Sequence, residues 1–301
     1  MVSHTLGTVT QLRERLSASS AYASSWTLDT SALLRVLEAA TRQVEAYCKG
    51  GQFGPVTKSL TYDLNGSKNG IINDPRPFNQ IDPRRASLGT PWIISLSSVT
   101  LYENTARDSS TAISSSDYLL FPYNTVGFSE APFYGLKFKD SGSNSPFSKT
   151  GQQVLVLEGD LGWSDQKSED TAISAADAST TAVTCVSSAN LSAGQTILAG
   201  SERLYIQSVT DSTNLVCERA VAGSVGASHT SATCSVYSYD AAPVEAALSL
   251  ASSAYISRMS GMQDTTEIAG ASYSFISGEQ KSTLKQVGSY SSHSYTSGVI
   301  F

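Results

Sequence analysis

Apolar residues recur with helical spacing in two stretches that lie far apart in the chain. The first runs from Asp29 to Cys48, with Asp29 as a suitable N-cap and Gly50-Gly51 as a stop. Its apolar face comprises Leu33, Val36, Leu37, Ala40, Val44, Tyr47 and Cys48, and its opposite face carries Arg35, Glu38, Arg42 and Glu45. This pattern predicts an amphipathic helix whose charged face meets solvent.

The second helical stretch runs from Pro243 to Met259. Pro243 suits the first turn of a helix, where its missing N–H is not needed. The apolar face comprises Val244, Ala247, Leu248, Ala251, Ala254, Tyr255 and Met259. A shorter helix is expected over Gln11–Leu16, with Thr8 as its cap. Helices therefore bracket the long middle of the chain.

Between these helices the apolar pattern changes to the period of two that is typical of strands. From Gln52 to about Asp165 we expect one antiparallel β unit, with turns at Asn65-Gly66 and Asn69-Gly70. The strand candidates are Val56–Asp63, Trp92–Leu96, Val99–Tyr102, Tyr118–Phe121, Gly135–Phe138 and Val154–Glu158. Pro, Gly, Asn and Ser clusters separate them.

A second group of short strands precedes the last helix. Ser168–Ser179 is small, polar and acidic, which is typical of a linker. The strands expected after it are Thr181–Val186, Thr196–Leu198, Leu204–Val209, Leu215–Arg219 and Thr233–Tyr237. Their density favours a small sandwich or barrel. The Ser-, Gly- and Tyr-rich stretch from Asp264 to Phe301 suits an arm that becomes ordered on a partner.

The predicted fold class is therefore α+β: a small helical bundle core with large antiparallel β insertions and an extended C-terminal arm. The expected divisions are 1–54 (N-terminal helical part), 55–167 (β unit), 168–240 (inserted small β module), 241–263 (second long helix) and 264–301 (arm).

Net charge and the lengths of apolar runs argue against nucleic-acid binding and against insertion in a membrane. The 301 residues carry a formal net charge of −6 and a pI near 5.1, without a cluster of basic side chains. Binding to nucleic acid depends on such clusters, so we expect no sequence-specific contact with DNA. The sequence contains neither a secretory signal pattern nor a run of apolar residues long enough to span a membrane. We expect a soluble protein made in the cytoplasm.

Residues suited to catalysis are sparse. The three histidines, His4, His229 and His293, are best interpreted as surface or turn residues. The acid pairs Glu158/Asp160 and Glu169/Asp170 could in principle serve a glycosidase, but solvated carboxylates beside turns explain them better. No acyl-transfer, nucleotide-binding or zinc-protease motif occurs. We predict no catalytic residue, cofactor or metal, and therefore no enzyme.

The four cysteines form no pattern that binds a metal. Cys48 ends the first helix, whereas Cys185, Cys217 and Cys234 lie on separate strand candidates. We interpret all four as small buried apolar residues. A disulfide among the last three stays open for an oxidising setting.

Several segments, taken in order, resemble one protein family. The sequence from Ala32 to Cys48, then Phe53 and Thr57–Asp63, is similar to head-to-tail connector (adaptor) proteins of tailed bacteriophages. Asp117–Asn124 resembles the family's DY-x-L-x-P-x-N segment, and Phe147–Trp163 resembles its F-x-x-G-x-x-V-x-V-x-G-x-x-GW segment. The helix from Pro243 to Arg258 corresponds to the family's second long helix. Each motif is loose, and the shared order carries the resemblance.

The stretch 180–237 departs from a minimal adaptor and resembles a small β module of phage structural proteins. Leu191–Ile197 is similar to the module's L-x-x-G-x-x-I pattern, and Cys217–His229 to its R-G-V-x-G-T-x-A-x-x-H pattern. Ala220 and Ser224 stand where this pattern has Gly and Thr. The chain also ends without the basic tail that is usual in the adaptor family.

The resemblance implies a structural virion protein at the neck, the head–tail interface. Its copies, about a dozen, would form a ring around the DNA channel and contact the portal protein and a tail or stopper protein. DNA would pass through the lumen without sequence-specific binding, and no membrane is involved. The expected partner-binding residues in the arm are Tyr273, Phe275, Ile276, Leu284, Val287 and Tyr290.

Two other functions stay open. A capsid-decorating or tail-tip host-binding virion protein would use the β module and the many Ser, Thr and Tyr residues. A carbohydrate-active enzyme rests only on the unplaced carboxylates.

Overall fold

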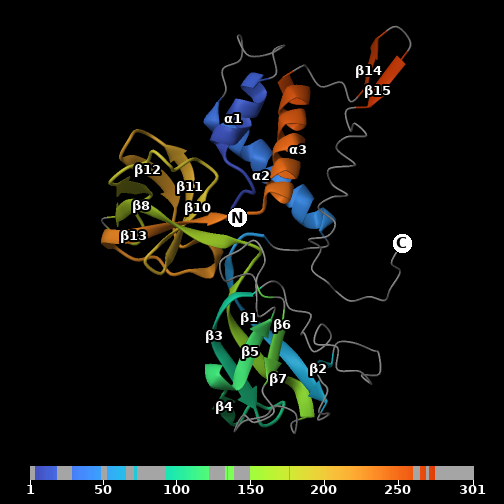
Figure 1. Ribbon diagram of the computed structural model, residues 1–301, viewed down its shortest axis with the longest axis vertical. Helices are drawn as coiled ribbons and strands as arrows, with labels where there is room; N and C mark the ends of the chain where they lie inside the picture. The colour runs from blue at the N-terminus through green and yellow to red at the C-terminus, as the bar shows by residue number, and fades with distance from the viewer. Residues whose placement is uncertain are drawn as a thin grey trace. The chain divides into compact units, whose positions relative to one another are not determined.

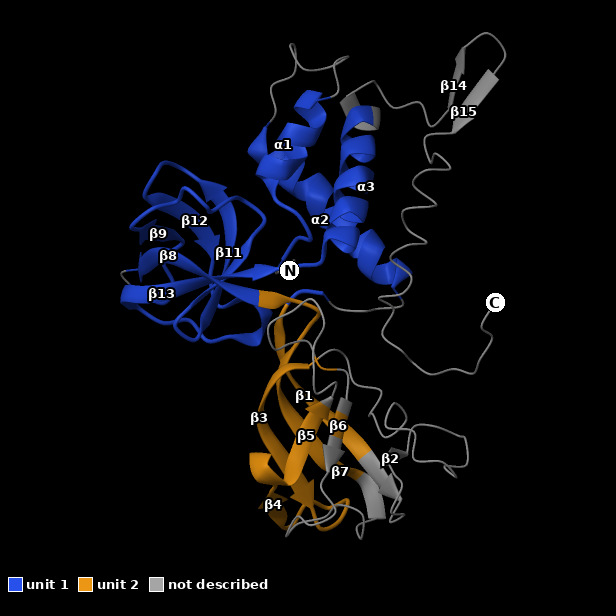
Figure 2. Cartoon of the chain, viewed as in Figure 1, with its two compact units in different colours: residues 1–54, 166–291 blue, residues 55–165, 292–301 orange. Residues whose placement is uncertain are grey.

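The computed structural model divides the chain into two compact units (Figure 2). Unit 1 comprises residues 1–54 and 166–291, and unit 2 comprises residues 55–165 and 292–301. The structure describes residues 4–18, 29–48, 53–65, 71–72, 93–121, 133, 135–138, 150–175, 177–259, 265–268 and 271–274.

The first helix of unit 1, α1 (Val9–Ala18), begins with a capping box. The hydroxyl of Thr8 accepts the N–H of Gln11 at 3.1 Å, and the Gln11 side chain accepts the N–H of Thr8 at 2.9 Å. The predicted cap is therefore confirmed. Val9, Leu12 and Leu16 form the buried face of the helix.

The two predicted long helices are present as α2 (Thr30–Tyr47) and α3 (Ala241–Met259), and they pack against each other. Asp29 caps α2, because its carboxylate accepts the N–H of Ser31. Two details of the predicted faces are wrong. Tyr47 is 43% exposed, and Glu45, expected in solvent, is only 8% exposed.

The remainder of the described part of unit 1 is largely a closed barrel of antiparallel strands in the order β10-β11-β12-β9-β8-β13 (Figure 1). Its strands are β8 (Asp165–Ala175), β9 (Ala182–Cys185), β10 (Thr196–Ala199), β11 (Glu202–Val209), β12 (Asn214–Glu218) and β13 (His229–Ser238). A short 3-10 helix, η3 (Val221–Gly223), lies between β12 and β13. The interior includes Ile173, Val183, Leu204, Ile206 and Leu215.

Strand β8 occupies most of the stretch that the sequence pattern assigned to a linker. The linker interpretation of residues 168–179 is therefore wrong for the residues up to Ala175. Ile173 and Ala175 face the core, whereas the other residues of β8 are polar or only partly buried. Pairing of Ile173 with Cys185 on β9, rather than an alternating apolar pattern, holds β8 in the barrel.

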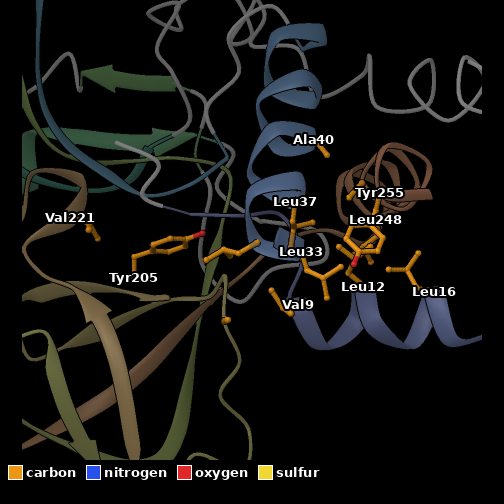
Figure 3. Close-up of a cluster of buried hydrophobic side chains, with 13 residues drawn as sticks. Val9, Leu12, Leu16, Leu33, Leu37, Ala40, Tyr205, Val221, Leu248 and Tyr255 are labelled. Atoms are coloured by element: carbon orange, nitrogen blue, oxygen red, sulfur yellow. The ribbon is translucent and has the colours of Figure 1, made fainter. Parts of the chain in front are cut away.

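Strand β11 joins the barrel to the helices because it is buried on both faces. Leu204 and Ile206 point into the barrel, and Tyr205 between them belongs to the core formed with the helices. Figure 3 shows Tyr205 reaching from the barrel toward Leu33 and Leu37 of α2. The other members of this core include Val9, Leu12, Ala193, Val221, Leu248, Ala251 and Tyr255.

This shared core corrects the predicted fold class. The described residues are mostly β, with a closed six-stranded barrel and three α-helices, and they contain no separate helical bundle core. The apolar faces of the helices are completed by the outer surface of β11 and the adjoining loops. The helices therefore form one layer against a barrel, because helices this short depend on tertiary packing of their apolar faces.

Unit 2 contains a five-stranded antiparallel sheet in the order β2-β1-β7-β3-β4. The strands are β1 (Val56–Asn65), β2 (Ile71–Ile72), β3 (Ile93–Tyr102), β4 (Ser110–Ala112) and β7 (Thr150–Leu161). A 3-10 turn, η1 (Ser115–Asp117), leads into β5 (Tyr118–Phe121), which pairs with β6 (Gly135–Phe138). The core of unit 2 includes Tyr62, Val99, Leu101, Leu136, Leu155 and Leu157.

One face of this sheet is polar near the end of β7. On β7, Glu158 lies opposite Ser59 and Ser98, and Asp160 lies opposite Thr57 and Ser95. Leu155 and Leu157 point to the other face and into the core. Val154 and Val156, on the same side of the strand as Glu158, are also buried. Strand β7 is therefore covered on both faces from Val154 to Leu157 and has a polar face only at Glu158 and Asp160.

Candidate functional site

The predicted partner-binding residues lie almost entirely outside the described part of the chain. Tyr273 belongs to β15 (Ala271–Ser274), where it pairs with Thr266 of β14 (Thr265–Ile268). The other five are Phe275, Ile276, Leu284, Val287 and Tyr290, and they lie beyond the described residues. Their role in binding a partner stays a prediction.

A groove of about 510 Å³ lies within unit 1, between the first turns of α2 and the outer face of β11 and β12. Helix α2 contributes the cap residue Asp29 together with Leu34 and Glu38, and the barrel contributes Tyr205 and Glu218. The remaining lining residues are Thr30, Ser31, Arg35, Gln207, Ser208 and Val216. This groove combines an apolar floor with carboxylates, and it is our candidate site.

Tyr205 is the centre of the groove floor. Its side chain is 1% exposed, and its hydroxyl donates to Glu38 Oε1 at 2.9 Å. Glu218 lies directly opposite Tyr205 in the β11–β12 ladder, so both side chains occupy the outer face of the barrel. Burial raises the pKa of Tyr205, and the charge of Glu38 raises it further. The tyrosine therefore stays a neutral hydrogen-bond donor.

A bulge in β11 shapes one wall of the groove. The register of the β11–β12 ladder shifts between Ile206 and Ser208, so Gln207 has no partner in that ladder. Sequence reasoning missed this groove because it placed Glu38 on a solvent-facing helix surface. The run Leu204-Tyr205-Ile206 was the available signal, since three consecutive apolar residues in a strand indicate burial on both faces.

Two histidines that the sequence pattern placed at the surface are buried. His4 is 0% exposed, and the side chain of His229 is 7% exposed. His4 Nε2 lies 2.9 Å from Glu45 Oε1, and His229 Nε2 lies 2.8 Å from Glu202 Oε2. The surface interpretation of both residues is wrong, because each finds a buried carboxylate that is remote in sequence.

Glu202, at the start of β11, is fully buried, and a set of donors surrounds it. Arg219 donates to both of its oxygens, from Nε at 2.8 Å and from Nη2 at 2.7 Å. The N–H groups of Ala220 and Ala227 each donate at 3.0 Å. Burial alone would raise the pKa of Glu202, but these hydrogen bonds outweigh it and lower the pKa. Such a carboxylate is an anchor for loops and has no free lone pair for catalysis.

Arg219 and His229 are the first and last residues of the β-module pattern noted in the sequence, and both contact Glu202. Ser224, which replaces the Thr of that pattern, accepts the N–H of Arg203 at 2.9 Å and donates to the carbonyl of Val221. Ala220, which replaces a Gly, has a φ of 53°. The pattern thus corresponds to a loop that is closed over a buried ion pair.

The second buried pair holds the segment that leads out of unit 1. The backbone nitrogen of Gly54 lies 3.1 Å from His4 Nε2, and Phe53 donates its N–H to Glu45 Oε1 at 3.4 Å. Arg42 pairs with the other oxygen of Glu45. Burial would raise the pKa of Glu45, and the contacts with His4 and Arg42 reverse this effect and lower it.

The other sequence candidates have structural partners or are buried. Ser98 donates to Glu158 at 2.9 Å, Thr57 donates to Asp160 at 2.7 Å, and Asn190 donates to Glu169 at 3.1 Å. These acids lie within strands, whereas the sequence pattern placed them beside turns. All four cysteines are free and buried, which confirms the interpretation as small apolar residues. Burial raises the pKa of Cys217 and of Cys234 to about 12.

Among the described residues, no group of three or more His, Cys, Asp or Glu side chains could hold a metal ion. None of the described helices combines the length and apolar character that a membrane crossing requires.

No family model matches the chain, and no curated protein or solved structure matches it either.

Proposed function

We propose that this chain is a structural virion protein, a head-to-tail adaptor that forms a ring between portal and tail around the DNA channel. The proposal rests on the ordered series of adaptor-like segments, which begins in α2 and ends in α3. A series in one order is stronger support than any single motif, because unrelated loose motifs rarely keep the same order.

The arrangement of unit 1 is compatible with this proposal. The two helices that carry the first and last adaptor-like segments pack together, although residues 55–165 of unit 2 and the barrel lie between them in sequence. A formal net charge of −6 also suits a lumen through which DNA must slide, because an acidic wall does not hold phosphates.

Electron microscopy of virions that contain the protein tests its location. A gold-labelled antibody against unit 1 should mark the junction of portal and tail. Label over the capsid shell or at the tail tip would contradict the proposal and would favour the decorating or host-binding alternative.

The predicted partner-binding residues in the arm need a separate test. Replacing Tyr273, Phe275, Ile276, Leu284, Val287 and Tyr290 by Ser should prevent attachment of the protein to portal-bearing heads. A matched control replaces Lys281 and Lys285 by Ser and keeps the apolar residues. Equal attachment of both variants would remove this role from the six residues and leave the proposed location untouched.

A further inference from the structure

The groove between α2 and the barrel has the chemistry of a receptor for a cationic side chain. Its floor is apolar: Leu34 is 8% exposed, Tyr205 is 1% exposed, and Val216 is half-buried beside them. Its volume of about 510 Å³ exceeds that of one side chain. The aliphatic part of a long side chain could therefore lie on this floor, where its apolar surface would be removed from water.

Two carboxylates at the floor have unused hydrogen-bonding capacity. Glu38 accepts the Tyr205 hydroxyl through Oε1, and within the described residues nothing donates to its Oε2. Glu218 is half-buried on the other side of Tyr205, and its side chain makes neither a hydrogen bond nor an ion pair with the described residues. Half-buried carboxylates without donors favour a charged ligand, because desolvation without a partner costs free energy.

The other charges around the groove are already engaged. Asp29 accepts from the backbone and hydroxyl of Ser31, and these bonds lower its pKa. Arg35, the cationic residue that lines the groove, donates to the carbonyl of Ser31 at 3.2 Å. Asp29 and Arg35 lie in the first two turns of α2, whereas Glu38 and Glu218 flank Tyr205 on the floor. The charged side chains at the floor of the groove are therefore both carboxylates.

We infer that this groove binds an arginine side chain presented by a segment of a partner protein. The planar guanidinium has several donors in a fixed fork, so it can bridge Glu38 and Glu218 while its stem covers Leu34 and Val216. Nucleic acid is excluded as the occupant because its phosphates would meet the same two carboxylates. The inference goes beyond the proposed function and does not depend on it.

Titration of the full chain with a synthetic peptide tests the inference. The probe is a short acetylated and amidated peptide with one arginine among serines and alanines. Its matched control contains citrulline, which has the same shape and no charge. Amide signals of the ¹⁵N-labelled protein at Glu38, Gln207 and Glu218 should shift saturably with the arginine peptide, and citrulline should weaken binding about five- to tenfold.

Two isosteric variants locate the contact. Glu218→Gln and Glu38→Gln should each weaken arginine-peptide binding by about fivefold or more, and the double variant should abolish it. Gln at position 38 still accepts the Tyr205 hydroxyl, so the fold is kept. Asp170→Asn removes the same charge from an exposed position of β8 that does not line the groove, and it should bind as the unchanged protein does.

Three results would overturn the inference. Equal shifts with the arginine and citrulline peptides would show that charge is not recognised. Equal affinity of Glu218→Gln and Asp170→Asn would place the peptide elsewhere. Shifts of the groove amides that depend on protein concentration without peptide would show that a second copy of the chain fills the groove. Failed binding leaves the adaptor proposal unaffected, since that proposal is tested by location in the virion.

Discussion

The two buried histidine–carboxylate pairs of unit 1 have the same chemistry and differ in how completely they are hydrogen-bonded. Both oxygens of Glu202 accept several donors, and its partner Arg219 also donates to the carbonyls of Asp177, Thr180 and Ala227. In the other pair, His4 Nδ1 is buried and has no hydrogen-bond partner among the described residues. The carboxylate of the Glu202 cluster is therefore fully hydrogen-bonded, whereas the His4 cluster keeps an unsatisfied ring nitrogen.

The difference follows from what each pair holds. The Glu202 cluster fastens the start of β11, the end of β12 and the loop before β13, which supplies backbone donors from several directions. The His4 cluster holds two consecutive residues, Phe53 and Gly54, whose N–H groups approach from one side. A saturated buried ion pair fixes geometry, whereas an unsatisfied one leaves part of its desolvation cost uncompensated.

The largest effect is expected from Arg219→Met, because it leaves the Glu202 carboxylate buried without its charged partner. The free energy of unfolding of unit 1 should fall by about 3–5 kcal/mol. Native-state hydrogen exchange of the β11 and β12 amides measures this loss for unit 1 alone. The double variant Glu202→Gln/Arg219→Met should recover part of it. A loss of unfolding free energy no greater than about 1 kcal/mol, as for a surface pair, would show that the Glu202 cluster is not the fully bonded buried pair that distinguishes it from the His4 cluster.

Gly54→Ala tests the second cluster. A Cβ at position 54 would collide with the imidazole ring of His4, which cannot retreat because it is fully buried. We expect a loss of about 1–3 kcal/mol in the unfolding free energy of unit 1. In a His4→Ala background the same change should cost much less. Equal costs in both backgrounds, measured by urea denaturation, would show that His4 does not occupy this space in solution.

Acid should reduce the stability that both clusters contribute, by less than the removal of a charged partner such as Arg219 does. The folded-state pKa values of Glu202 and Glu45 lie below their ordinary values, so protonation favours the unfolded chain. Their contribution is complete above the unfolded pKa of Glu, about 4.3, and is lost as the pH falls through the folded values. Thermal unfolding between pH 7 and 3 should show this loss. If the Glu202→Gln/Arg219→Met variant lost stability with falling pH as steeply as the unchanged protein does, Glu202 would not be a source of the acid sensitivity.

The smallest effect concerns the loop above the Glu202 cluster. Ala220 is held at φ 53°, a left-handed conformation that costs an alanine more than a glycine. Ala220→Gly should therefore raise the unfolding free energy by about 0.5–1 kcal/mol. Ala232→Gly, inside strand β13, is the matched control and should lower it by a similar amount, about 0.5–1 kcal/mol. Destabilisation by both changes would refute the proposed strain at position 220.

Local features of the fold could be predicted from the sequence. Thr8 and Asp29 cap helices because a short polar side chain can reach an N–H that lies two or three residues ahead. β5 and β6 were expected at their observed bounds. The predicted Asn-Gly turns between β1 and β2 involve residues 66–70, which lie outside the described part of the chain, so they stay a prediction. These signals depend on residues close together in the chain, so one sequence contains them.

The candidate site could not be predicted in the same way. Glu38, Tyr205 and Glu218 are brought together by the packing of α2 against the barrel, and their separation in sequence contains no periodic signal. Glu45 has the position of a solvent-facing residue on a helical wheel and is buried because the N-terminal segment places His4 on it. Such contacts depend on which surfaces meet.

The helices and their caps, most of the strands, and the acidic character that disfavours DNA binding follow from the sequence alone. Tertiary packing makes β8 a strand, gives the helices a core shared with β11, and buries His4 and His229 against carboxylates. Local conformation follows from the chain's own sterics and hydrogen bonds, whereas burial of a charge is tolerated only where distant residues supply its partners.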